Sequence, residues 1–260
     1  QSRNRYMKDR FSEIDLLIER VKFHIQDPLF TNEFNKRQNK EVSVLIDDNE
    51  ILRTFSYLIA YSQNSNSELV ERLILSGTLD TAFNNFIIDD VAKMNPCDIA
   101  DKYWGKISVI RQQAKIFHIV SLARKIKAIG SISAILNDNS IPKIIKTEQD
   151  IDDFWVGFDK LRKILKEKKI PFFQSTTSLL HFLLETGYDC VKPDLVVMKV
   201  AKKLKLVKDE TGDKNLRAAV KIIQLYSLSR NIRPSIVDLY FLIDEGQRGA
   251  KKFVTNDFYN

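Results

Sequence analysis

The chain has 260 residues, of which 44% are hydrophobic and 29% are charged, and this balance is typical of a folded protein with a sizeable core. No apolar run approaches the ~18 residues that a membrane helix needs, and no apolar segment follows the basic first ten residues, so we expect no spanning, secreted or lipid-anchored form. Cys97 and Cys190 lack CxxC or CxxH spacing, which excludes a disulfide framework or a zinc cage and fits a reducing, cytoplasmic setting. The net charge of +7 favours a polyanionic partner.

Eight glycines and six prolines are few for a sheet protein, so we expect an all-α fold. Apolar residues at helical spacing predict a first helix over 14–25, which ends where Asp27-Pro28 begins a loop or short turns that run to about residue 48. The next helices are expected at 49–63, 67–77, 79–86, 88–93 and 97–103.

The longest periodic segment runs from Ile107 to Ala128 and predicts one continuous helix. One face of it is expected to hold Ile110, Ala114, Phe117, Ser121 and Arg124, with Ile116, Val120 and Ala123 beside it. Further helices are expected at 131–137, 150–169, 176–187, 194–206, 214–230 and 235–245. Without a repeat or a long linker, we expect one two-lobed helical unit over 1–260, with lobes at 1–48 plus 194–260 and at 49–193.

Two basic segments flank a short turn between residues 158 and 208. The turn reads IPFFQST and places Ser175, Thr176 and Thr177 at the start of a helix, where backbone N–H groups suit a phosphate. Lysines at helical spacing often form only a solvated face, but beside a helix start they also suit a nucleic-acid backbone. The basic residues are Lys160, Arg162, Lys163, Lys166, Lys168 and Lys169 before the turn, and Lys192, Lys199, Lys202, Lys203, Lys205 and Lys208 after it.

Asp194 follows Pro193 at the start of a predicted helix. It can act as a helix N-cap, a position that aspartate favours. It can also present a carboxylate that stabilises positive charge developing on a sugar ring. Spacing alone leaves both interpretations open.

The order of these segments resembles the helix-hairpin-helix DNA glycosylase superfamily, and within it the bacterial 3-methyladenine DNA glycosylases. The resemblance covers roughly residues 27–206. It implies a two-lobed helical fold, a hairpin that binds DNA and a catalytic aspartate at Asp194. The matching stretches are DPLFTNEFN (27–35), ISVIRQQAKIFHIVSLARKI (107–126), DFWVGF (153–158) and LKEKKIPFFQSTTSLLHFLLETG (165–187).

The chain departs from that family at several positions. The hydrophobic-Gly-hydrophobic-Gly hairpin is replaced by Phe172, Phe173, Gln174 and Ser175, and Thr177 stands where members that also cleave the backbone carry lysine. The resemblance therefore implies a monofunctional enzyme in which water attacks the sugar. The family's glutamate and base-stacking tryptophan align with Ala60 and Glu68, and its zinc ligands are missing. We expect no metal and no other cofactor.

An enzyme that acts on a base must extrude it from the duplex and hold it in a pocket. By the resemblance, Gln63 fills the gap left by the extruded base, although it can also be a polar helix end. Aromatic and polar candidates for the pocket are Tyr61, Phe30, Trp104, Trp155 and Asn64. The DNA-binding candidates are Gln63, Lys168, Lys169, Gln174, Ser175, Thr176, Thr177 and Lys199.

The sequence thus predicts a monomeric DNA repair glycosylase that hydrolyses the N-glycosidic bond of a damaged base, with an alkylated purine in duplex DNA as the expected substrate. A non-catalytic helix-hairpin-helix DNA-binding protein is the alternative, since the hairpin glycines are absent. A helical protein-interaction domain with incidental lysines is a third interpretation.

Overall fold

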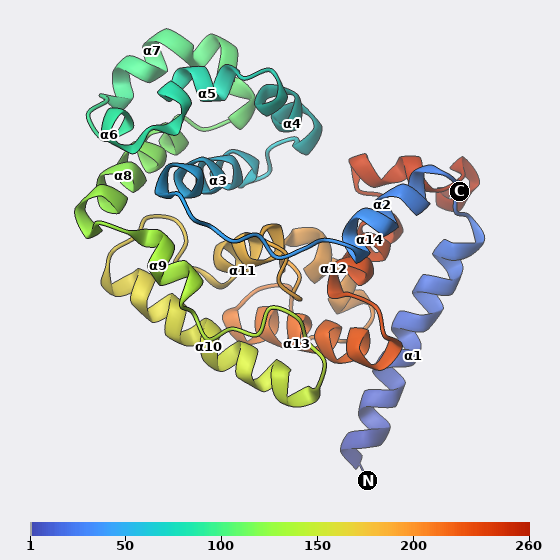
Figure 1. The fold of residues 1–260 in the computed structure, drawn as a ribbon. Coiled ribbons are helices and arrows are strands. Elements are labelled where there is room, and N and C mark those ends of the chain that lie inside the picture. The colour runs from blue at the N-terminus through green and yellow to red at the C-terminus, as the bar shows by residue number, and fades with distance from the viewer. Residues whose placement is uncertain (1) are drawn as a thin grey trace. The chain divides into compact units, whose positions relative to one another are not determined.

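The computed structural model describes residues 2–260, with side chains placed for residue 7 and for residues 9–260. The fold is all-α, as predicted (Figure 1). Within the described residues the only extended pairing is an isolated bridge between Ile25 and Val254. In the same part of the chain, no helix combines the length and the apolar character needed to cross a membrane.

Packing contacts divide the chain into two compact units. The first unit comprises Gln1–Val42, Ile141–Trp155 and Thr176–Asn260, and the second comprises Ser43–Ser140 and Val156–Ser175. Compared with the expected lobes, this division places 141–155 and 176–193 in the first unit and 43–48 in the second.

The first unit is organised around α14, which contacts α1, α2, α12 and α13. Pro234 opens α14, where a missing N–H costs nothing, and the buried residues that follow cover most of its circumference. The helices of this unit are α1 (Ser2–Phe23), α2 (Leu29–Gln38), α11 (Thr176–Glu185), α12 (Leu195–Lys203), α13 (Asp213–Arg230), α14 (Pro234–Asp244), η3 (Arg248–Phe253) and η4 (Asn256–Tyr259).

A buried ion pair between Arg233 and Asp189 ties several segments of the first unit together. The Nε atom of Arg233 lies 2.9 Å from Asp189 Oδ1, and its Nη2 atom donates to the Gly187 carbonyl at 2.7 Å. Asp189 Oδ2 accepts the Ile145 N–H at 2.9 Å, while Arg233 also donates to the Lys40 carbonyl. The Asp189 carboxylate and the Arg233 guanidinium thus both have hydrogen-bond partners, which buried charged groups require.

The second unit is built on α3, which packs against α8, while α8 also contacts α6 and α7. Figure 1 shows α3 in blue and α6, α7 and α8 in green. The elements of this unit are α3 (Asp48–Tyr61), α4 (Ser67–Leu75), α5 (Thr78–Ala82), η1 (Asn84–Phe86), α6 (Ile88–Val91), α7 (Pro96–Ile107), η2 (Ser108–Ile110), α8 (Ala114–Ile129) and α9 (Ile132–Asn137). Helix α10 (Glu148–Glu167) begins in the first unit and ends in the second.

The prediction of a loop from Asp27 to residue 48 was wrong, because α2 occupies Leu29–Gln38. Pro28 is the N-cap of α2, so this proline begins a helix as well as ending one. The helix is fixed by contacts that are distant in sequence. Phe30 packs on Tyr240 with ring centroids 5.6 Å apart, and Arg37 Nη1 lies 2.9 Å from Asp238 Oδ2.

The prediction of a continuous helix from Ile107 to Ala128 was also wrong. Helix α7 ends at Ile107, α8 starts only at Ala114, and Arg111 between them has a φ of 72°. The face expected to run through Phe117 and Arg124 is not the buried one, since Phe117 is 47% exposed and Arg124 is exposed, whereas Ile116, Val120 and Ala123, expected beside it, are buried. The buried face of α8 instead holds Lys115, Ile116, Ile119, Val120, Leu122, Ala123 and Ile126.

Candidate nucleic-acid interface

A short polar loop, residues 62–66, follows α3 in the second unit and carries Gln63, a predicted DNA-binding residue, and Asn64, a predicted residue of the base pocket. Gln63 and Asn64 are both exposed, with φ values of 54° and 62°. The left-handed region disfavours residues other than glycine, although asparagine tolerates it better than glutamine does. Two such residues in succession therefore need support from the surrounding structure.

Lys115 provides that support from α8. Its side chain is 0% exposed, and its Nζ atom donates to the Ala60 carbonyl at 3.1 Å and to the Ser62 carbonyl at 2.7 Å. It also donates to Ser65 Oγ at 2.9 Å. These acceptors lie at the end of α3, where backbone carbonyls lack helical partners and a cation is favoured. Lys115 thus fixes both ends of the turn that displays Gln63 and Asn64.

The break between α7 and α8 supplies a second brace for the 62–66 loop. Arg111 Nη1 donates to the Asn64 carbonyl at 2.8 Å, and Ser65 Oγ donates to the Ile110 carbonyl at 3.2 Å. A helix running unbroken through these residues would pair the Ile110 carbonyl within its own backbone. The break between α7 and α8, which sequence periodicity did not predict, therefore allows Ile110 and Arg111 to bond with the 62–66 loop.

The hairpin, residues 168–175, is the second part of the interface. Lys169 has a φ of 52°, and its neighbour Ile170 donates its N–H to the Leu165 carbonyl at 2.9 Å, which closes the end of α10. Phe172 has a φ of 76°, and the Phe173 N–H donates to the Pro171 carbonyl at 3.0 Å, so Phe172 is the central residue of a γ-turn. The hairpin thus also contains left-handed residues other than glycine.

Aromatic packing fixes the hairpin against the same two helices that carry the loop. Phe173 is fully buried and stacks on Phe55 of α3, with ring centroids 4.0 Å apart and planes at 20°. Phe172 lies 6.1 Å from the His118 ring of α8. His118 is three residues after Lys115, about 5 Å along the helix axis. One short stretch of α8 therefore contacts both the loop and the hairpin.

Gln174, a predicted DNA-binding residue, bonds within the hairpin. Its Nε2 atom donates to the Ile170 carbonyl at 2.6 Å, and the Gln174 backbone carbonyl accepts from Arg162 Nε at 2.7 Å. The polar groups of Gln174 and Arg162 thus help to shape the turn.

The two basic segments differ in their ion pairs. In the first segment, Lys163 lies 3.9 Å from Glu167 Oε1, whereas Lys160, Lys166, Lys168 and Lys169 are exposed and have no ion-pair partner among the described residues. In the second segment, three lysines have acidic partners, which are Glu245 for Lys199, Asp244 for Lys203 and Asp209 for Lys202. The Glu245 contact raises the pKa of Lys199. Lysines without an acidic partner therefore remain on the surface next to the hairpin.

The three residues predicted to open a phosphate-binding helix have different environments. Thr176 is buried and its hydroxyl donates to Asp213, so this group is already engaged. Ser175 is exposed and Thr177 is half-buried. Asp213 also pairs with Arg217 at 2.9 Å. A carboxylate beside Thr176 opposes an anion at that position.

Asp194 lies in the first unit and caps α12. Its Oδ1 atom accepts the Val197 N–H at 3.0 Å, and the side chain is half-buried. Asp194 raises the pKa of the buried Asp238 carboxyl by repulsion, although burial of Asp238 itself is the larger cause. The N-cap interpretation is thus observed, and it leaves one carboxylate oxygen outside this bond.

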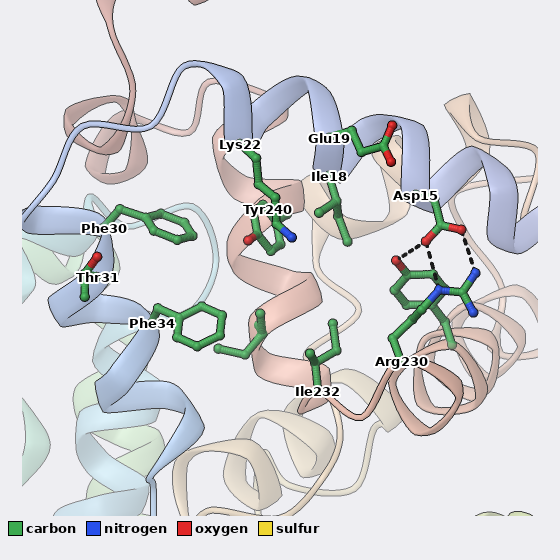
Figure 2. Close-up of a pocket in the computed structure, with 12 residues that line it drawn as sticks. Asp15, Ile18, Glu19, Lys22, Phe30, Thr31, Phe34, Arg230, Ile232 and Tyr240 are labelled. Atoms are coloured by element: carbon green, nitrogen blue, oxygen red, sulfur yellow. Dashed lines mark hydrogen bonds and ion pairs between the residues drawn. The ribbon is translucent and has the colours of Figure 1, made fainter.

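The predicted aromatic pocket residues fall in different units. Tyr61 ends α3 and Trp104 lies on α7, both half-buried in the second unit. Phe30 is buried in the first unit, where it lines a cavity with Phe34 and Tyr240 (Figure 2). Trp155 is also in the first unit and donates from Nε1 to Gln224 Oε1 at 3.0 Å. Its role is in the core.

The histidines and potential metal ligands add little chemistry. Burial and the nearby Lys192 lower the pKa of His181 to about 3, so it is neutral at physiological pH. Among residues 2–260 no group of three or more His, Cys, Asp or Glu side chains is arranged to hold a metal ion.

Sequence reasoning missed Lys115 and Arg111. A signal for Lys115 was present, since Lys115, Ile119, Leu122 and Ile126 recur on one helical face that is otherwise apolar. Arg111 carried no such signal.

No protein-family model, no curated protein and no solved structure matches this chain.

Proposed function

We propose that this protein is a monofunctional DNA glycosylase of the helix-hairpin-helix type, which removes a damaged base by hydrolysing its N-glycosidic bond. The observation that carries the proposal is the 62–66 loop, where exposed Gln63 and Asn64 are held in left-handed conformations by buried Lys115. Backbone strain of this kind is commonly retained where it serves a function.

The loop is suited to enter a base stack because its shape is set before DNA binds. Extruding a base costs about a few kcal/mol, and a side chain that occupies the vacated space offsets part of that cost. Gln63 can also donate and accept hydrogen bonds with the base left unpaired. A loop fixed by Lys115 and Arg111 loses little conformational entropy on insertion.

The hairpin would bind the DNA backbone beside the loop. The exposed lysines 160, 166, 168 and 169 supply positive charge, and each phosphate that they neutralise adds salt-dependent affinity.

Asp194 is the proposed catalytic carboxylate. As the bond between C1′ and the base nitrogen breaks, positive charge builds up on the sugar, and a carboxylate stabilises it electrostatically. Water then forms the new bond to C1′ and loses a proton to solvent, while the base leaves with the bonding electron pair. An alkylated purine carries a positive charge and needs little acid assistance, which agrees with a neutral His181.

A second candidate function is DNA binding without catalysis. It is favoured by the hydrogen bond that already engages Asp194 as an N-cap, and by Asp213 beside Thr176 at the start of α11. In this case the loop and the hairpin would recognise distorted duplex, and Asp194 would have only a structural role.

The test is release of free base from methylated duplex DNA by the wild-type chain and by Asp194→Asn. Asparagine is as good an N-cap as aspartate, so the variant keeps the fold and loses only the charge. The matched control is Asp47→Asn, because Asp47 caps α3 through the same kind of bond, to the Asn49 N–H at 2.9 Å.

A glycosylase predicts that Asp194→Asn lowers base release by about 10²-fold or more while its affinity for DNA is retained. Asp47→Asn should release base at the wild-type rate. Salt-dependent binding without base release by the wild type would instead support the non-catalytic function. The absence of salt-dependent binding would contradict both.

A further inference from the structure

The first unit contains a cavity of about 480 Å³ where α13 ends and α14 begins. This volume is within the range of small-molecule sites. The end of α2 and the segment 144–146 complete its walls, so all of its lining residues belong to the first unit. Ile145, Leu228, Ile232 and Pro234 supply the apolar part of the lining.

A buried ion pair in the lining holds these segments together. Arg233 Nε lies 2.9 Å from Asp189 Oδ1, and Arg233 Nη1 donates to the Lys40 carbonyl. Asp189 Oδ2 accepts the Ile145 N–H at 2.9 Å, and the Asp189 carbonyl accepts from Gln224 Nε2 at 2.9 Å. These bonds join the end of α2, the segment 144–146, α13 and the start of α14. The cavity is therefore preformed, and the ion pair itself is already engaged.

Two buried polar atoms of the lining have no such engagement. Ser227 of α13 is only 1% exposed, and neither its Oγ atom nor the buried Oε1 atom of Gln38 has a hydrogen-bond partner in the described part of the chain. A buried polar atom without a partner lowers stability, so a ligand that bonds to it relieves that cost. Gln38 Oε1 needs a donor and Ser227 Oγ can donate or accept, so ligand hydroxyl groups suit both.

The charge of the lining is positive. Apart from the Arg233–Asp189 pair, its charged residues are Lys40 and Lys146, and both are exposed. Neither lysine has an ion-pair partner among residues 2–260, and Asp150 instead accepts the backbone N–H of Lys146 at 2.8 Å. A phosphate monoester carries about two negative charges at neutral pH, so it gains more from two lysines than a carboxylate does.

We propose that this cavity binds a small phosphate ester of a polyol, which belongs to the sugar-phosphate class. Its hydroxyl groups bond to Ser227 Oγ and Gln38 Oε1, and its phosphate pairs with Lys40 and Lys146. The site lies within the first unit and does not depend on the proposed glycosylase activity.

The probe is glucose 6-phosphate, compared with glucose, which lacks the charge, with inorganic phosphate, which lacks the polyol, and with gluconate, which carries a carboxylate instead. Binding is measured by chemical-shift titration of the ¹⁵N-labelled full chain, which also locates each compound. Glucose 6-phosphate should bind with a Kd on the order of 0.1–1 mM and shift the amide signals of residues 224–234. Glucose and inorganic phosphate should bind about tenfold more weakly, and gluconate about threefold.

Ser227→Ala removes the hydroxyl that has no partner. It should weaken glucose 6-phosphate about fivefold, leave inorganic phosphate unchanged and not lower the midpoint of urea unfolding. Ser56→Ala is the matched control, because Ser56 is a similarly buried helical serine of the second unit whose Oγ donates to the Leu52 carbonyl at 2.6 Å. It should lower the unfolding midpoint and leave the affinity for glucose 6-phosphate unchanged.

Lys146→Met removes one positive charge from the lining. It should weaken glucose 6-phosphate and inorganic phosphate about threefold each and leave glucose unchanged. Lys160→Met removes the same charge from an exposed position in the second unit, and it should change none of these affinities.

Absence of shifts in residues 224–234 at about 10 mM glucose 6-phosphate would overturn the proposal, since the expected Kd lies well below that concentration. Shifts confined to residues 160–177 would also overturn it, because they would assign the anion to the hairpin lysines. Unchanged affinity in Ser227→Ala would overturn the hydroxyl contact, since an ordered water would then suffice for Ser227. A preference for gluconate would overturn the phosphate ester class.

Discussion

Lys115 in the second unit and Arg233 in the first unit both donate hydrogen bonds to backbone carbonyls near helix ends. The carbonyl of Gly187 and the carboxylate of Asp189, which Arg233 binds, are buried, so that cluster joins segments of a core. The carbonyls bound by Lys115 flank an exposed polar loop, so the same device there presents Gln63 and Asn64 to solvent. The comparison teaches that a buried cation can either close a core or support a protruding surface.

The largest expected effect is on stability, from Arg233→Met. The variant leaves the buried Asp189 carboxylate without its cation, and breaking such a pair costs about 3–5 kcal/mol. Urea unfolding measures the loss. Arg124→Met is the control, because exposed Arg124 also donates to two carbonyls, of Ala92 and Met94, and its loss should cost about 1 kcal/mol or less. Equal losses would show that the Arg233 cluster is no more than a surface contact.

Gly187→Ala should cost about 3 kcal/mol, because the glycine has a φ of 96° and a Cβ there would lie 2.5 Å from the Glu41 carbonyl oxygen. Gly77→Ala is the matched control, with a φ of 72° and nothing within 4 Å of its Cβ. It should cost only about 1 kcal/mol from backbone strain. Urea unfolding of both variants measures the difference, and a difference near zero would mean that the segment bound by Arg233 can shift.

Lys115→Met should cost about 2 kcal/mol, because two buried backbone carbonyls and Ser65 Oγ lose a charged donor. It should also weaken DNA binding about tenfold by loosening the 62–66 loop. Lys127→Met removes the same charge from α8 at an exposed site, where Lys127 pairs with Asp89. DNA affinity is measured by titration at fixed salt. If both variants weaken DNA binding equally, the loss is due to charge, and the hypothesis that Lys115 supports the loop for DNA binding is refuted.

Gln63→Ala should leave the free energy of unfolding within about 0.5 kcal/mol of wild type, since the side chain is exposed. It should lower base extrusion about tenfold, as read by 2-aminopurine fluorescence in duplex DNA. Asn85→Ala, at another exposed left-handed residue of the same unit, should change neither quantity. Unchanged base extrusion by Gln63→Ala would contradict the proposal that Gln63 enters the base stack.

Periodicity and helix-breaking residues predicted much of the fold. The helix at α4 begins and ends within two residues of its prediction, and Gly77 after it adopts the expected left-handed conformation with a φ of 72°. The start of α12 at Asp194 was also predicted, since an aspartate before an apolar helical run is a local signal. Local signals of this kind need no knowledge of distant contacts.

The missed features depend on distant contacts. Helix α2 is fixed by Tyr240 and Asp238, about 200 positions away, and its own sequence is too polar to show a helical stripe. The break at Arg111 is fixed by its bond to the Asn64 carbonyl. For the site, the resemblance selected Gln63 as the residue that fills the gap in the duplex and Asn64 was a pocket candidate, but the sequence could not show that Phe30 and Trp104 belong to different units.

The enclosure of Lys115 also has a spectroscopic consequence. Protons on an exposed ammonium group exchange with water too fast to be observed at neutral pH, whereas a group with 0% exposure exchanges only when the structure around it opens. Lys115 should therefore give a resolved ¹⁵N–¹H side-chain signal that is absent from Lys168 and Lys169. The lifetime of that signal reports how often the turn around Gln63 opens, in the free protein and on any nucleic acid that it binds.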